Sequence, residues 1–179
     1  MANTCFTEIR LVGEKDSLLS LVNMIDRVAQ DTLDNCYNFE EMATALDQKP
    51  EEGTDMRGKW WNARIDLSSE PAVLSFLEEH AWKPGTLLGT LLHGTFLGKS
   101  ISAVYTRSSD WDAGIHTCDD SEGRFFPETL AYYCKGDEHI GFCRSEEDAL
   151  SWCRENYPDE TFELEDFEFK TIDRSSAHD

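Results

Sequence analysis

The chain has 179 residues and a formal net charge of -20, with 36 Asp and Glu against 16 Lys and Arg. This excess repels a nucleic-acid backbone, an anionic membrane or a phosphate-rich surface, and so argues against each as the natural partner. Hydrophobic residues make up 40% of the chain, too many for a disordered acidic protein. We therefore predict a folded protein, either one domain of residues 1–179 or a subdivision into 1–49 and 57–174 around an acidic connector.

The first residues show no sign of a secretory signal, because Met1 to Cys5 carry no basic region and no apolar stretch follows them. The longest apolar run, residues 86–97, is interrupted by Gly89, His93 and Gly94 and is too short to span a bilayer. We therefore expect a cytoplasmic protein. In that compartment the six cysteines are expected to be reduced thiols of the core.

The first predicted elements are a strand and two helices. Thr7, Ile9 and Leu11 alternate with charged residues, which indicates a half-buried strand that ends at Gly13. A helix with an apolar stripe from Leu18 to Ala29 follows, and Asp16 or Ser17 is placed to cap it. A shorter helix over residues 39–46 is predicted from its helical spacing and from the Asn38-x-x-Glu41 cap pattern. Residues 49–55 are expected to form a solvated connector.

A second strand and helix are predicted after the connector. Apolar residues alternate from Trp61 to Leu67, which is typical of a strand. Ser68 or Ser69 is then placed to cap a helix with Pro71 in its first turn, and we expect it to bury Val73, Leu74, Leu77 and Ala81.

Residues 94–100 end in Gly-Lys-Ser, as a phosphate-binding loop does. That motif requires four residues between its glycines, but only three separate Gly94 from Gly98, and His93 stands where the first glycine belongs. The motif also opens a helix, whereas residues 101–106 have the composition of a strand. We therefore interpret the segment as a tight glycine turn that leads into a sheet.

The last third of the chain is predicted to contain strands and one helix. We expect a strand from Ile101 that turns through residues 108–113 into 114–118, and a hairpin of residues 129–134 and 139–143. A capping box at Ser145 begins a helix that Pro158 stops, and its buried residues are expected to be Ala149, Leu150, Cys153 and Tyr157. A β-bulge near Glu165 and Asp166 is expected to bring both Phe162 with Leu164 and Phe167 with Phe169 onto the core.

Strands that are separated in some places by helices and in others by hairpins indicate an α+β fold with a mixed or antiparallel sheet and helices packed on one face. A ferredoxin-like arrangement fits this order best, with elaboration or duplication of the motif left open.

Candidates for a catalytic or metal site are weak. A zinc site would draw on His116, Cys118, Cys134, His139 and Cys143, but these residues lack the closely spaced ligand pairs of structural zinc sites. The carboxylate pairs Asp110 with Asp112 and Asp119 with Asp120 keep open a metal-dependent hydrolase, built around Asp110, Asp112, His116 and Cys118. No nucleophile with an obvious base is present, so we predict no catalytic residue, no metal and no cofactor.

The strongest local anomaly is acidic. Ten acids between residues 145 and 168 face a single base, Arg154. Such a surface either keeps the protein soluble and guards a sheet edge, or it binds a basic partner as a mimic of DNA. The residues that we expect to bind a basic, nucleic-acid-binding host protein are Glu155, Asp159, Glu160, Glu163, Glu165, Asp166, Glu168 and Trp111. An alternative is a homo-oligomeric assembly protein with exposed apolar surface near Trp60, Trp82 and Trp111, whereas Trp61 and Trp152 are expected in the core.

Three short stretches carry a family resemblance: Asn3-Thr4-Cys5 leading into a strand, Trp111-Asp112-Ala113, and Tyr157 to Glu165 after a helix. In order and context they resemble the YubB-type ferredoxin-like proteins of plasmids and phages, although residues 106–110 replace the Trp-Gly-Thr-Lys run of that family. The resemblance implies a ferredoxin-like fold and a cytosolic protein of a mobile element, and it transfers no catalytic residue. The sequence thus favours a non-enzymatic protein that acts by protein–protein binding.

Overall fold

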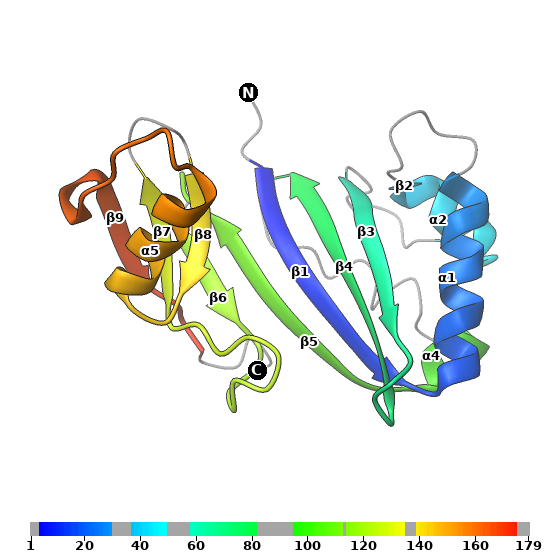
Figure 1. Cartoon of the computed structure of the whole chain (residues 1–179). Coiled ribbons are helices and arrows are strands. Elements are labelled where there is room, and N and C mark those ends of the chain that lie inside the picture. The colour runs from blue at the N-terminus through cyan, green and yellow to red at the C-terminus, as the bar shows by residue number, and fades with distance from the viewer. Residues whose placement is uncertain are drawn as a thin grey trace. The chain divides into compact units, whose positions relative to one another are not determined.

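The computed structural model describes residues 4–29, 37–49, 58–81, 95–112, 114–134 and 139–174. The chain forms an α+β fold that divides into two compact units, an N-terminal unit, Met1–Asp110, and a C-terminal unit, Trp111–Asp179 (Figure 1). This division falls after Asp110, and residues 50–55 of the predicted connector lie outside the described residues.

The described elements of the N-terminal unit follow the order β-α-β-α-β-β-α-β. They are β1 (Thr4–Gly13), α1 (Lys15–Ala29), β2 (Tyr37–Asn38), α2 (Phe39–Ala45), β3 (Gly58–Asp66), β4 (Ala72–Ala81), α4 (Phe96–Lys99) and β5 (Ile101–Asp110). Its strands lie in the order β2-β3-β4-β1-β5, and each neighbouring pair is antiparallel.

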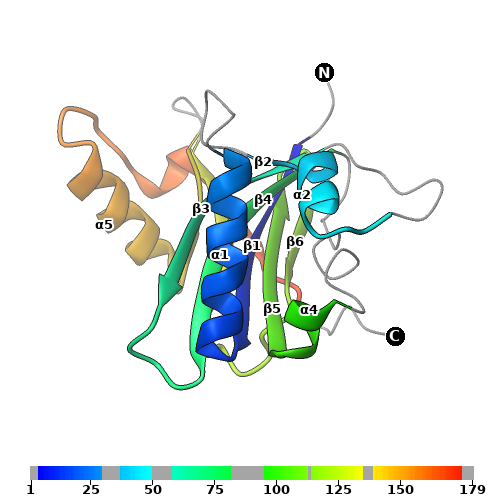
Figure 2. The ribbon, with the colours of Figure 1, turned by 90° about the vertical axis from the view of Figure 1, so that its right-hand side faces the viewer.

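Helices α1 and α2 cover one face of this sheet, and α1 lies across β1, β3 and β4 (Figure 2). The core lies between the helices and the strands. The strands contribute Ile9, Leu11, Trp60, Leu74 and Phe76, and the helical segment contributes Leu18, Leu21, Met42, Ala43 and Leu46. The predicted strand over residues 7–11 and both predicted helices are confirmed. Helix α1 begins at Lys15, so the predicted caps Asp16 and Ser17 lie inside its first turn.

The predicted helix after Ser68 is wrong, because Ala72–Ala81 is strand β4. This strand pairs with β1 on one side and with β3 on the other, and it places Leu74, Phe76, Glu78 and His80 on the helix-covered face. The predicted helix stripe buried Leu74 but not Phe76, whereas the strand buries both. Burying Phe76 is worth about 1.5–3 kcal/mol, more than the difference of less than about 1 kcal/mol per residue in helix propensity, so pairing overrides propensity. His80 therefore lies in a strand and not in a helix.

Strand β3 contains an irregularity that the alternation did not reveal. The register of β3 against β4 shifts between Trp61 and Arg64. Because of this shift, Trp60 and Ile65, which have opposite parity, both pack on the core side. Trp60 is 1% exposed, so the predicted exposed apolar surface near Trp60 is wrong.

The described elements of the C-terminal unit are β6 (Ile115–Cys118), β7 (Leu130–Cys134), β8 (His139–Cys143), α5 (Glu146–Asn156), the 3₁₀ turn η1 (Leu164–Asp166) and β9 (Phe167–Thr171). An antiparallel sheet has the order β8-β7-β9, and α5 packs on one of its faces (Figure 1). The predicted hairpin and the Ser145 cap are confirmed, and Ser145 accepts a hydrogen bond from the Asp148 amide.

Three expectations for the last third of the chain need correction. Strand β5 continues to Asp110, so residues 108–110 are strand and not turn. The 3₁₀ turn η1 stands where the β-bulge was predicted, and it separates buried Phe162 from β9. Trp152 was expected in the core but is 47% exposed.

In the part of the chain that the structure describes, none of the helices has the length and apolar character needed to cross a bilayer.

Candidate functional site

The predicted acidic surface surrounds α5 in the C-terminal unit. Eight of the ten acids between residues 145 and 168 are exposed, and Asp166 and Glu168 are half-buried. The exposed acids lie in the first turn of α5, at its end and in the segment that leads to β9: Glu146, Glu147, Asp148, Glu155, Asp159, Glu160, Glu163 and Glu165.

The one base of this segment is held by the main chain. Arg154 donates from Nε and Nη2 to the Phe162 carbonyl, at 3.2 and 2.7 Å. This bond ties the end of α5 to the segment before β9, so the guanidinium has a structural role there. The carboxylates around it therefore lie on a surface whose net charge is strongly negative.

The structure does not bring all the predicted binding residues together. Glu168 pairs with Tyr133, and both side chains lie on the sheet face opposite α5. Trp111 stacks on Tyr133, with 5.4 Å between ring centroids, and the Lys170 amine lies 4.4 Å from the Trp111 ring centroid. Trp111 and Glu168 thus belong to one face, whereas α5 and its acids belong to the other.

Asp166 is also used within the fold. Its carboxylate accepts a hydrogen bond from the Glu163 amide at 2.8 Å, and the Glu163 side chain accepts from the backbone of Asp166 in return. This capping box fixes the 3₁₀ turn η1 before β9. The acids most available to a partner are therefore those that are exposed and hold no such bond, with Glu155, Asp159 and Glu165 as the clearest examples.

The predicted zinc ligands are divided between two faces of the C-terminal sheet. His139 stacks on Tyr157, with 4.1 Å between ring centroids, and lies on the α5 side of the sheet. Cys134 and Cys143 lie on the same side. His116 packs edge-on against Trp111, on the side of Tyr133. Across the described ranges no three His, Cys, Asp or Glu side chains gather closely enough to hold a metal ion. The donor geometry supports neither the zinc site nor the metal-dependent hydrolase.

Asp120, one of the paired carboxylates, has a structural role. Its Oδ1 accepts from the Arg124 amide at 3.0 Å, and its Oδ2 accepts from the amides of Phe125 and Phe126 at 2.7 and 2.9 Å. Burial acts to raise the pKa of Asp120, but these donors, helped by the positive charge of Arg174, outweigh burial and lower the pKa. The carboxylate therefore stays ionised and organises the loop before β7.

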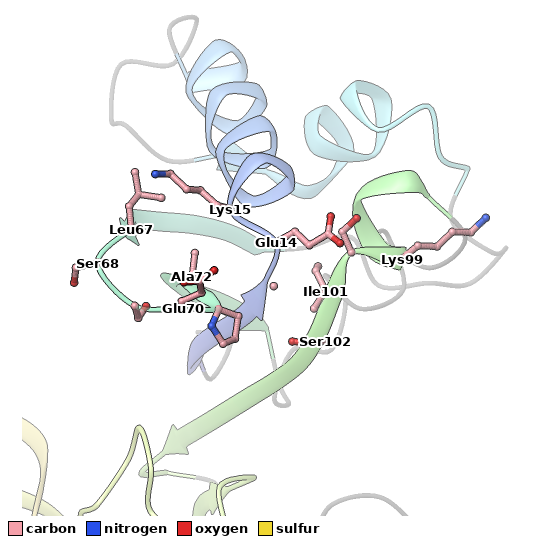
Figure 3. Close-up of a pocket in the computed structure, with 13 residues that line it drawn as sticks. Glu14, Lys15, Leu67, Ser68, Glu70, Ala72, Lys99, Ile101 and Ser102 are labelled. Atoms are coloured by element: carbon pink, nitrogen blue, oxygen red, sulfur yellow. The ribbon is translucent and has the colours of Figure 1, made fainter.

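The N-terminal unit contains a cleft of about 820 Å³ where β1 meets α1, β3 meets β4 and α4 meets β5 (Figure 3). Two of its serine side chains form hydrogen bonds within the fold, one inside the β3–β4 turn and one between β5 and β1. Ser68 donates to Asp66 Oδ1 at 2.6 Å, and Ser102 donates to the Val12 carbonyl at 3.0 Å. Lys99 points away from the cleft, and Lys15 lies at its rim (Figure 3). The cleft has no convergent set of catalytic groups.

The Gly98-Lys99-Ser100 segment in this cleft does not form a phosphate-binding loop. The Gly98 amide donates to Thr95 Oγ1, the Lys99 amide to the Thr95 carbonyl and the Ser100 amide to the Leu97 carbonyl. These amides, which would cradle a phosphate in such a loop, are thus used to close the single turn α4. Strand β5 follows, as the sequence predicted.

A buried polar cluster lies at the opposite end of the N-terminal sheet. Thr7 and Ser108 are 2.8 Å apart at their hydroxyl oxygens, and Trp60 Nε1 donates to Glu78 Oε2 at 2.9 Å. Burial raises the pKa of the Cys5 thiol to about 12, and the negative charges of Asp110 and Glu78 contribute to the rise. Cys5 is therefore a protonated thiol at neutral pH and a poor nucleophile.

The thiols of the described residues are consistent with core positions. Cys5, Cys118, Cys134, Cys143 and Cys153 are free and buried, as the composition predicted, and Cys36 lies outside the described residues.

A residue that the sequence interpretation misplaced is Trp152, which is exposed on α5. Its spacing from Ala149 and Cys153 resembles that of a core position, but the neighbouring acids Glu155 and Asp148 mark this part of the helix as solvent-facing.

A scan against protein-family models gave no match, and searches of curated proteins and of solved structures gave none either.

Proposed function

We propose that this protein is a non-enzymatic binding protein, and that the acidic surface around α5 binds a basic surface of a partner protein. The observation that carries the proposal is that eight exposed carboxylates surround α5 while its one base is bonded to the Phe162 carbonyl. Such a surface attracts a positively charged partner and accelerates its encounter. It would occupy a groove that otherwise binds nucleic acid, as a mimic of DNA does.

The proposal also covers the fold of the N-terminal unit and the origin of the protein. We infer a ferredoxin-like arrangement in the N-terminal unit, because β3, β4, β1 and β5 follow the split β-α-β order of that fold, with β1 and β4 at the centre. In this interpretation β2 and the C-terminal unit are elaborations. The YubB-type resemblance, a cytoplasmic location and an origin in a phage or mobile element are part of the same proposal, and they rest on the sequence alone.

The homo-oligomer is the less supported alternative. One of its three tryptophans, Trp60, is buried, and a second, Trp82, lies outside the described residues. Trp111 is half-buried and stacked on Tyr133. The acidic surface has many more exposed groups with which to meet a partner.

Paired charge-reversal variants test the proposal. The first carries Glu155→Lys, Asp159→Lys and Glu165→Lys. The matched control carries Asp26→Lys, Glu70→Lys and Glu122→Lys, which are exposed positions outside residues 145–168. Both change the net charge equally. Each protein is immobilised, exposed to a bacterial lysate at low salt and eluted with a salt gradient, and every eluted protein is tested for displacement from a labelled DNA duplex.

We expect the native chain and the control to capture a DNA-binding protein, to release it as salt screens the charges, and to displace it from the duplex. The α5 variant should lose about tenfold or more in affinity, because it removes the local field and not only net charge. Equal capture by both variants, capture that resists salt, or no capture at all would overturn the proposal.

A further inference from the structure

The C-terminal sheet has an edge at β8. Within the described residues, β8 pairs with β7 alone, and the sheet order is β8-β7-β9. Ile140, on the face of β8 opposite α5, is 51% exposed. An edge strand of this kind presents backbone N–H and C=O groups that an extended peptide can pair with, and its exposed apolar side chain offers a contact for that peptide.

A groove of about 470 Å³ lies beside this edge, between β8 and α5. Tyr132, Phe142, Ala149 and Trp152 are among the residues that line it, and Trp152 is 47% exposed. Tyr132 reaches the groove because position 141 is glycine: a Cβ there would lie 2.6 Å from Tyr132 Cζ. The groove therefore has an aromatic lining directly beside the strand edge, and its volume suits a few side chains.

The charge around the groove is mostly negative. Glu128 and Asp148 line it, and the base among its lining residues is Arg144. Burial raises the pKa of Cys143 to about 11, and the charges of Asp148, Glu128 and Glu146 add to the rise. The two lining carboxylates, Glu128 and Asp148, give the groove a negative field, which favours basic groups on a ligand that enters it.

We propose that the β8 edge and its groove bind an extended segment of the partner in which basic and apolar residues alternate. The segment pairs with β8 as an added strand, so its side chains alternate between the two faces of the sheet. Its apolar side chains contact Ile140 on the face opposite α5, and its basic side chains enter the groove, where they meet Glu128 and Asp148 and pack on the Trp152 ring. This inference rests on the proposed function, since it states how a basic partner is bound. Trp111 and Glu168 are not part of this site, because neither lines the groove and Glu168 lies on β9, on the far side of β7 from β8.

The probe for this site is the synthetic peptide acetyl-(Lys-Val)₄-amide with a fluorescent label, titrated with the full chain at low salt. Two peptides serve as controls: acetyl-(Glu-Val)₄-amide, which reverses the charge, and a Lys-Val peptide that is N-methylated at alternate residues on one edge. N-methylation keeps the charge and removes the donors needed for strand pairing. We expect the Lys-Val peptide to bind, and we expect each control peptide to bind about tenfold more weakly or not at all.

Variants separate binding at the groove from attraction to the net charge of the chain. The Glu128→Gln, Asp148→Asn double variant should weaken the Lys-Val peptide about three- to tenfold, and Trp152→Ala about tenfold or more. The matched control, Asp112→Asn with Glu122→Gln, removes the same charge at exposed positions of the same unit that lie outside residues 145–168, and it should change affinity less than twofold. Circular dichroism checks that each variant is folded, and the N-methylated peptide tests strand pairing without any variant.

The outcomes distinguish the two proposals. Equal binding of the N-methylated peptide, or equal weakening by the control variant, would overturn the groove while the acidic surface remained supported. Failure of the native chain to bind the Lys-Val peptide would also overturn the groove. The acidic surface would remain supported if the chain still captured a DNA-binding protein in a salt-sensitive way, and both proposals would be overturned if it did not. Concentration-dependent self-association that the peptide abolishes would assign the edge to a second copy of the chain and would also overturn the inference.

Discussion

Trp60 on β3 donates its indole N–H to the carboxylate of Glu78 on β4, with 2.9 Å between Nε1 and Oε2 and both side chains fully buried. The two residues face each other directly in the strand register. The donated bond offsets part of the desolvation cost of the buried carboxyl group, so loss of the donor leaves more of that cost uncompensated. The pair therefore connects two strands at the point where the core becomes polar.

A double-mutant cycle measures this relationship. Trp60→Phe removes the donor and keeps an aromatic ring, and we expect it to lower the free energy of unfolding by about 1–3 kcal/mol. In the Glu78→Gln background the same change should cost at least about 1 kcal/mol less, because no buried charge is left without that donor. Urea denaturation of the four proteins provides the values. Strictly additive costs would contradict the coupling.

The same pair shows why the fold could be predicted only in part. The alternation around β1 and the Ser145 cap of α5 were recognised, because both are local patterns with a single interpretation. The segment of β4 carries leucines at spacings that suit either a helix or a strand, and Glu78 and His80 look like solvent-facing helix residues. Their burial is decided by pairing with β1 and β3, which are distant in sequence.

The candidate site was predictable to a similar degree. The excess of carboxylates after Ser145 is visible in the sequence, and most of them are exposed. Which face each acid occupies depends on the register of β9 against β7, which places Glu168 beside Tyr133 and away from α5. The groove at β8 depends on contacts between Gly141 and Tyr132 that no local pattern encodes.

Gly141→Ala is expected to destabilise the chain. The added Cβ would lie 2.6 Å from Tyr132 Cζ and Oη, so the buried ring must move. Overpacking of this kind costs about 1–3 kcal/mol. In a Tyr132→Ala background the ring is absent, and the same substitution should cost close to nothing. Thermal and urea unfolding of the single and double variants test this, and an equal cost in both backgrounds would show that the ring is not the obstacle.

Acid should weaken the loop that Asp120 organises. The pKa of Asp120 is lower in the folded chain than its value of about 3.9 in the unfolded chain. The carboxylate therefore stabilises the folded chain above the unfolded pKa, and this stabilisation is lost as the pH falls toward the folded pKa. Asp120→Asn should remove about 1–3 kcal/mol at neutral pH. It should also flatten the pH dependence of stability below about pH 4. Urea midpoints measured from pH 7 to pH 3 provide the comparison, with Glu122→Gln, an exposed neighbour, as the control.

The raised pKa values of Cys5 and Cys143 predict slow reaction with thiol reagents. Burial raises the pKa of Cys5 to about 12 and that of Cys143 to about 11, so at pH 8 less than about one thiol in a thousand is ionised at either position. In a Cys36→Ser background, a disulfide reagent at pH 8 should label neither residue within minutes in the folded chain. It should label the five remaining cysteines at once in urea. Peptide mapping by mass spectrometry identifies the labelled positions, and rapid native labelling of Cys143 would mean that the wall of the groove opens to solvent, which would also weaken the case for a preformed peptide site beside β8.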